Sequence, residues 1–217
     1  MEQFLFVKQE FGTLVLIKTL ALVFLILVYC LKAYLLTRYR VVKEISVPKG
    51  DTTKGIISSL SVIVCPSAME STRDITKNWL EFFIFHVGIL VAIVVSFMIP
   101  YAPNLLQPAV TTLFMIIMGL GFIAGFVRII KKFTKPDIKV ISSKDDYFSI
   151  IIITIFLLLG AISMTGNREI IVAFLALTAF LLVYVPLSKI SHYLYWPFAR
   201  YYMGKHFGRR GIYMKRR

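Results

Sequence analysis

Two histidines lie within long apolar segments of this 217-residue chain. His86 follows FFIF and precedes VGIL, whereas His192 lies in PLSKISHYLYWP. An ionisable side chain inside a membrane-spanning segment is costly, so each histidine predicts a function and a partner group. Two neutral imidazoles on different helices suit the two axial positions of a haem iron. The alternative is that both histidines form hydrogen bonds within a helix bundle and bind no cofactor.

Five apolar runs are long enough to carry these histidines into a bilayer, which requires about 20 apolar residues per helix. The runs cover residues 14–36, 79–100, 108–130, 147–164 and 170–195. A content of 58% hydrophobic and 17% charged residues is too apolar for a soluble globular domain. We therefore predict an all-α integral membrane protein with five transmembrane helices in one membrane domain, residues 1–217. The first run exceeds a signal-peptide core and no small-residue cleavage site follows it, so we expect it to be retained.

The basic residues predict the orientation of these helices. The net charge of +14 is concentrated in residues 38–77, 128–144 and 189–217, which together contain 21 of the 25 Lys and Arg residues. These segments alternate with nearly uncharged connections, which is the positive-inside pattern. The N-terminus is predicted outside, and a long loop (37–78) and a basic tail (196–217) are predicted in the cytoplasm. The charge then faces lipid headgroups, and no nucleic-acid partner is expected.

This topology places both histidines in the cytoplasmic half of the bilayer. His86 lies seven residues past Trp79 and His192 lies four residues before Trp196, so their depths are similar. Cys30 and Cys65 are the only cysteines, and they predict neither a disulfide framework nor an iron–sulfur cluster.

Three shorter segments predict local structure. Pro100 and Pro108 are expected to end the second run and begin the third. Residues 142–146, SSKDD, are typical of a helix N-terminus. The mildly apolar piece 55–64 is expected on the bilayer surface, against a partner subunit, or as an ordinary surface loop.

Three motifs together resemble the gamma subunit of respiratory nitrate reductases and the cytochrome b subunits of heterodisulfide reductases. They are HVGIL at 86–90, the glycine-rich third run ending in Arg128 and Lys131, and residues 186–200 with His192 and WPFAR. The similarity extends from about Phe82 to Arg210. It implies that His86 and His192 are the axial ligands of a haem b on the cytoplasmic side.

The resemblance also implies what is missing. Nitrate reductase members hold two haems with four histidines, but here Ser96 and Phe174 stand at the positions of the other pair. The third histidine, His206, lies in the basic tail. A single haem b is therefore predicted, with the quinone site close to it and protons exchanged with the cytoplasm.

Further site residues are predicted around this haem. Gly121 and Gly125 would pack against it, or simply permit close helix packing. Arg128, Lys131 and Arg200 would hold its propionates, or act only as topology signals. The candidates for binding a menaquinone-type quinone are Lys189, Tyr193 and Tyr195, which alternatively anchor the chain at the interface.

These expectations describe a non-catalytic electron-transfer subunit in a prokaryotic cell membrane. It would transfer electrons between the quinone pool and an iron–sulfur subunit on the cytoplasmic side. Two alternatives remain open: a membrane anchor subunit without a cofactor, and a small proton-linked carrier.

Overall fold

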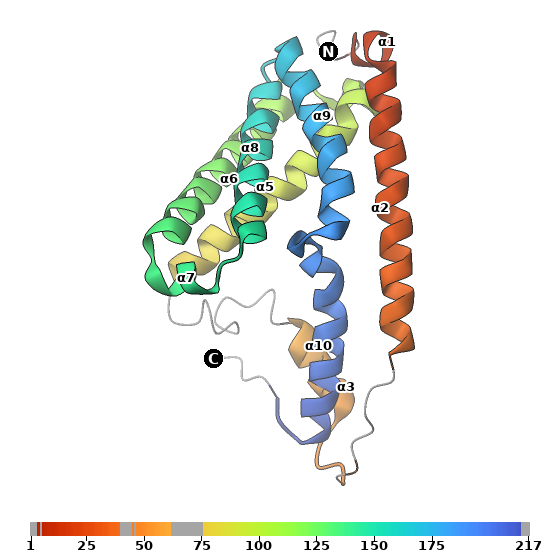
Figure 1. Cartoon of the computed structure of the whole chain (residues 1–217), viewed down its shortest axis with the longest axis vertical. Coiled ribbons are helices and arrows are strands. Elements are labelled where there is room, and N and C mark those ends of the chain that lie inside the picture. Colours follow the sequence, from red (N-terminus) through yellow and green to blue (C-terminus); the bar gives the residue numbers. More distant parts are fainter. Residues whose placement is uncertain (1–3, 5, 40–44, 46, 62–75, 214–217) are drawn as a thin grey trace. The chain divides into compact units, whose positions relative to one another are not determined.

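A computed structural model describes residues 4, 6–39, 45, 47–61 and 76–213, and this part of the chain is helical without a strand (Figure 1). The helices are α1 (Phe6–Glu10), α2 (Gly12–Arg38), α3 (Thr52–Leu60), α5 (Thr76–Tyr101), α6 (Pro108–Thr134), α7 (Pro136–Ile141), α8 (Lys144–Ser163), α9 (Arg168–Tyr184) and α10 (His192–Arg209). Short 3-10 turns cover Pro103–Leu105, Val185–Leu187 and Lys189–Ser191.

Five helical segments are long and apolar enough to cross a membrane. They are Gly12–Arg38, Asn78–Tyr101, Pro108–Thr134, Lys144–Ser163 and Arg168–Leu187. The predicted all-α class and the five candidate spans are thereby confirmed by length and composition. Both proline boundaries lie close to the observed ends, and Ser143 caps α8 by donating its backbone N–H to Asp146 Oδ2 at 2.7 Å.

The fifth helix ends earlier than the predicted boundary at residue 195. Pro186 lacks a backbone N–H, and the chain turns through Val185–Leu187 before Ser188 adopts an extended conformation. A new helix, α10, begins at His192 and continues to Arg209. His192 therefore starts a separate helix, and much of the predicted tail 196–217 is helical.

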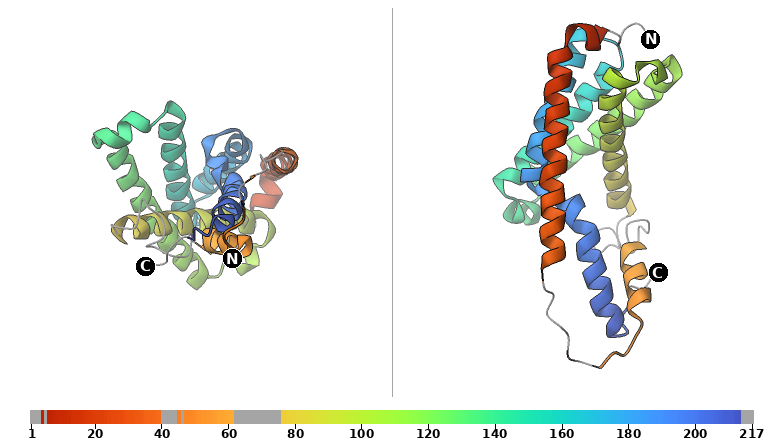
Figure 2. Two further views of the ribbon diagram at one scale, coloured as in Figure 1. Left: turned by 90° about the horizontal axis from the view of Figure 1, so that it is seen from below. Right: turned by 90° about the vertical axis from the view of Figure 1, so that its right-hand side faces the viewer.

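The described chain forms two compact units, and the single membrane domain of the sequence analysis stays a prediction. Unit 1 contains the residues up to Leu27 together with Glu81–Ile190. Unit 2 contains Val28–Leu80 and the residues from Ser191 onward. Within unit 2, α3 and α10 lie side by side (Figure 2). The piece 55–64 thus includes part of a helix that packs against its own chain, and its last residues lie outside the described part, as does Cys65.

Glycines set the closest helix contacts in unit 1. A Cβ on Gly121 of α6 would lie 3.1 Å from the Cα of Gly88 on α5 and 3.4 Å from Leu157 Cδ2 on α8. Such backbone approach strengthens van der Waals packing, on which helix association in lipid largely depends. A Cβ on Gly119, two residues earlier in α6, would meet no neighbouring atom within 4 Å.

This contrast gives a test of the packing. Replacing Gly121 with Leu should lower the free energy of unfolding by about 1–3 kcal/mol, because the added side chain must separate α5 from α6. The matched substitution Gly119→Leu should have little effect. Thermal unfolding of the purified variants in detergent would measure both, and equal losses would contradict the assigned contact.

Candidate functional site

His86 has the hydrogen bonding expected of a metal-ligating histidine. Its Nδ1 lies 2.7 Å from the carbonyl oxygen of Phe82, one turn earlier in α5, and the side chain is half-buried. Donation from Nδ1 to this carbonyl places the lone pair of the ring on Nε2. The Phe82 ring lies 4.1 Å from the imidazole and the Phe85 ring 5.6 Å, measured between centroids. The surroundings fix one tautomer in an aromatic environment.

Two of the predicted propionate-binding cations lie in the same cluster as His86. Arg128 of α6 lies over the rings of Phe82 and Phe85, at 5.9 and 5.3 Å from their centroids. Its Nε is also 3.5 Å from a carboxylate oxygen of Glu81, and Lys131 forms an ion pair with the same carboxylate. Sequence reasoning missed Glu81, although its place five residues before His86 in an apolar run was a usable signal.

The predicted haem-packing glycines contact protein. Gly121 faces Gly88, and a Cβ on Gly125 would lie 2.6 Å from Thr154 Oγ1 and 2.8 Å from Phe85 Cε2. These contacts match the helix-packing interpretation of the two residues.

His192 is the first residue of α10 and belongs to unit 2, whereas His86 belongs to unit 1. Its side chain is exposed, and the ring of Tyr193 lies 6.4 Å from it. Further along α10, the guanidinium of Arg200 lies 5.9 Å from the centroid of Trp196. The pairing of His86 with His192 therefore stays a prediction, as does the propionate role of Arg200.

The three quinone candidates have different surroundings. Tyr193 packs edge-to-face on Tyr29 of α2 with 5.5 Å between centroids, and Tyr195 lies beneath Lys32 at 5.5 Å. Desolvation raises the pKa of the Tyr193 phenol above its ordinary value, so it stays a hydrogen-bond donor at neutral pH. Lys189 lies four residues before Tyr193 in sequence and belongs to unit 1.

Lys189 closes a polar cluster between α8 and the end of α9. Its ammonium donates to Asp146 Oδ2 at 2.9 Å and to Ser143 Oγ at 2.8 Å. Its backbone N–H donates to Asp145, which also accepts from the Tyr184 hydroxyl at 2.5 Å. The side chain proposed for quinone binding thus fixes the start of α8.

Core residues occupy positions 96 and 174, where the sequence analysis placed the missing second pair of histidines. Phe174 is fully buried and stacks on Phe156 with 5.0 Å between centroids. Ser96 is also fully buried, and its hydroxyl donates to the carbonyl of Ile93 at 2.7 Å.

Lys18 is a buried cation that the sequence analysis missed. It lies inside the candidate span α2, is only 1% exposed, and donates from Nζ to the carbonyl oxygen of Ser96 at 2.6 Å. Its ammonium also lies over Phe97, 4.3 Å from the ring centroid, and 5.2 Å from that of Tyr101. In the described part of the chain no carboxylate forms an ion pair with it.

Pro100 explains this contact. In a helix the carbonyl of Ser96 would accept from the N–H of residue 100, which proline lacks. An unsatisfied carbonyl inside a bilayer costs several kcal/mol because no water is available there. Lys18 supplies the missing donor from a neighbouring helix, so its burial has a structural cause. The sequence contained a signal for this contact, namely a lysine within the first apolar run and a proline within the second.

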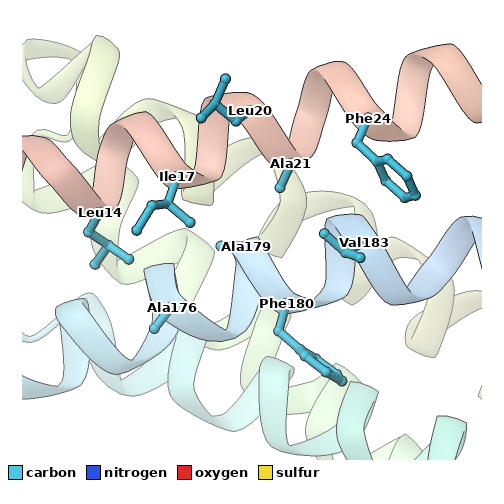
Figure 3. A pocket seen from close by; sticks show the side chains of 9 residues that line it. All are labelled: Leu14, Ile17, Leu20, Ala21, Phe24, Ala176, Ala179, Phe180 and Val183. Carbon is cyan, nitrogen blue, oxygen red and sulfur yellow. The ribbon is translucent and has the colours of Figure 1, made fainter.

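An apolar groove runs between α2 and α9 in unit 1 (Figure 3). Its volume is about 590 Å³, and Leu14, Ile17, Leu20, Ala21, Phe24, Ala176, Ala179, Phe180 and Val183 line it. This lining suits a hydrocarbon chain and offers no side-chain donor to a polar headgroup.

In three comparisons, no family model, no curated protein and no solved structure matches the chain. The class that the fold indicates is a multi-pass, all-helical membrane protein. Within the described residues no group of three or more His, Cys, Asp or Glu side chains could hold a metal ion. A haem needs only two axial ligands, so this finding leaves the histidine pair as the candidate site.

The role of Lys18 is testable by a double-mutant cycle with Pro100. Lys18→Met should lower the free energy of unfolding of the wild-type protein. In a protein that already carries Pro100→Ala, the same change should cost about 1 kcal/mol less, because alanine at position 100 restores an N–H donor to the carbonyl of Ser96. Thermal unfolding of the four proteins in detergent gives the coupling. Equal effects of Lys18→Met in both backgrounds would show that Lys18 does not replace the missing proline donor.

Proposed function

We propose that the chain is the membrane subunit of a redox complex in a prokaryotic cell membrane. One b-type haem, held by His86 and His192, transfers electrons between a quinone pool and an iron–sulfur subunit on the cytoplasmic side. The chain itself catalyses no substrate reaction. The N-terminus is outside and the C-terminus is cytoplasmic.

The observation that carries the proposal is the hydrogen bond from His86 Nδ1 to Phe82. It holds the imidazole in the tautomer that coordinates iron through Nε2, as the outer hydrogen bonds of metal-bound histidines do. The residues around His86 fit the group chemically: aromatic rings lie beside the imidazole, Arg128 lies over these rings, and Lys131 shares the carboxylate of Glu81 with Arg128.

The haem, when bound, supplies the one-electron chemistry that amino acid side chains lack. The residues of this chain bind and tune it. His86 and His192 ligate the iron, and Arg128 and Lys131 compensate the propionate charges. Glu81 already balances part of the charge of these two cations, which limits how strongly they stabilise added negative charge.

Quinone chemistry requires proton exchange on the side where the haem lies. Tyr193 and Tyr195 are the proposed hydrogen-bond donors to the quinone ring. The hydroxyl of Tyr184 with the carboxylate of Asp145 forms a pair suited to proton transfer at the end of α9. Lys189 contributes by orienting Asp145 through its backbone N–H.

The other two functions differ in what they require. A membrane anchor without a cofactor needs only the helices and a partner surface. A proton-linked carrier needs an ionisable group accessible from both sides, whereas the buried Lys18 bonds to the carbonyl that Pro100 leaves without a donor.

A reduced-minus-oxidised absorbance spectrum of the purified chain tests the proposal. We expect a b-type haem signal that His86→Ala and His192→Ala each abolish, because each removes one axial ligand. His206→Ala, in the same helix as His192, is the control and should leave the signal unchanged.

Absence of a b-type signal from the wild-type chain would reject the proposed haem and favour the membrane anchor without a cofactor. A normal signal in the His192→Ala variant would reject the ligand pair while keeping the haem.

A further inference from the structure

The apolar groove between α2 and α9 lies wholly within the candidate spans of unit 1 (Figure 3). Along α2 its lining extends from Leu14 to Phe24, which is roughly 15 Å at helical rise. Three of its nine lining residues are alanines, Ala21, Ala176 and Ala179, whose small side chains leave room for an apolar chain between the helices. Because no lining side chain is polar, a ligand with a polar head must place that head beyond an end of the groove.

One end of the groove leads to the side chain of a tyrosine. Phe24 of α2 bounds this end together with Phe180 and Val183 of α9 (Figure 3). Phe180 stacks on Tyr184, one turn later in α9, with 5.7 Å between ring centroids and 10° between ring planes. The apolar lining is therefore continuous with the ring of Tyr184.

The hydroxyl groups beyond this end can bond to an oxygen atom of a ligand. Tyr184 donates to Asp145 Oδ1 at 2.5 Å, and Ser149 Oγ lies 2.9 Å from the Tyr184 hydroxyl oxygen. Both Tyr184 and Ser149 are half-buried. A hydroxyl donates and accepts, so Ser149 can donate to the carbonyl of a quinone, and the oxygen of Tyr184 can accept from the hydroxyl of a quinol.

The charges at this end favour a neutral head over the phosphate of a phospholipid. A phosphate at the Tyr184 hydroxyl would lie beside the carboxylate of Asp145, and two negative charges repel strongly at the edge of a membrane, where the dielectric constant is low. The ammonium of Lys189 bonds instead to Asp146 and Ser143. A quinone head is uncharged and needs only hydrogen bonds.

We propose that the groove binds the isoprenoid tail of a quinone and places the quinone head at Tyr184 and Ser149. The proposal rests on the proposed function for the choice of a quinone as the ligand. The site lies wholly within unit 1 and contains neither Tyr193 nor Tyr195, so it can be tested independently of those two residues. Burial of the tail supplies affinity, and the hydroxyl groups fix the orientation of the head.

The test uses the full chain in phosphatidylcholine nanodiscs and a menaquinone analogue with a photoreactive group in its isoprenoid tail. Cross-linked peptides are identified by mass spectrometry after illumination. We expect cross-links in residues 14–24 and 176–183, and an excess of unlabelled menaquinone should suppress them.

Two pairs of variants test the tail and the head of the site. Ala176→Phe should reduce the groove cross-links about tenfold, because the ring displaces methylene groups of the tail. The control Ala173→Phe adds the same ring at an exposed position of α9 outside the lining and should leave them unchanged. Tyr184→Phe keeps the ring stack and removes the hydroxyl, so about tenfold more unlabelled menaquinone should be needed for suppression. Tyr147→Phe, which removes a hydroxyl bonded to a backbone carbonyl, is its control.

Several outcomes would overturn the proposal. Equal losses in Ala176→Phe and Ala173→Phe, or cross-links spread evenly over all spans, would show that the groove has no preference for the tail. Suppression by added phosphatidylglycerol as effective as that by menaquinone would identify a lipid acyl chain as the occupant. Absence of cross-links from nanodiscs that contain two chains would identify a second copy.

The haem spectrum separates this proposal from the proposed function. A haem signal without groove cross-links would reject only the quinone site in the groove. Groove cross-links without a haem signal would reject only the proposed electron transfer through a haem.

Discussion

The carbonyl oxygen of Ser96 is the polar group on which the arrangement of unit 1 depends most. Pro100 denies it a donor within α5, and the bilayer offers no water to replace that donor. Lys18 satisfies it from α2 and places its ammonium over aromatic rings, so a charge that would be costly in hydrocarbon becomes part of a helix contact. Each group accounts for the other: the lysine needs an acceptor and the carbonyl needs a donor.

This polar contact matters because α2 lacks the packing that joins the other helices. Glycines bring α5 and α6 together and join α3 to α10, but a Cβ on Gly12 at the start of α2 would meet no neighbouring atom within 4 Å. Most of the apolar side chains of α2 are exposed. Within unit 1 it is held instead by Lys18, by the hydroxyl pair of Thr19 and Tyr101 at 2.6 Å, and by the adjoining ion pair of Glu10 with Arg168. Hydrogen bonds between helices in lipid can replace shape complementarity in this way.

The sequence was sufficient for the five candidate spans, because length and apolar content decide them, and for the cap at Ser143. It failed where tertiary contacts compete with composition. Residues 192–195 were assigned to the fifth span and residues 196–209 to a tail, yet together they form α10, whose backbone packs on α3 through glycines distant in sequence. Lys18 was missed because one charge barely changes the average hydropathy of a long run.

At the candidate site, His86 and the nearby cations were predictable from motifs, but Glu81 and the tautomer of His86 depend on side-chain placement.

The structure separates basic residues that the positive-inside pattern treats alike. Arg128 and Lys131 share the carboxylate of Glu81, and Lys189 bonds to Asp146, so their charge is largely balanced within unit 1. Residues 49–54 and 205–213 contain five Lys and Arg residues and one carboxylate, Asp51, which caps α3. A topology signal requires only positive charge near a span end, and Arg38 already provides it at the end of α2.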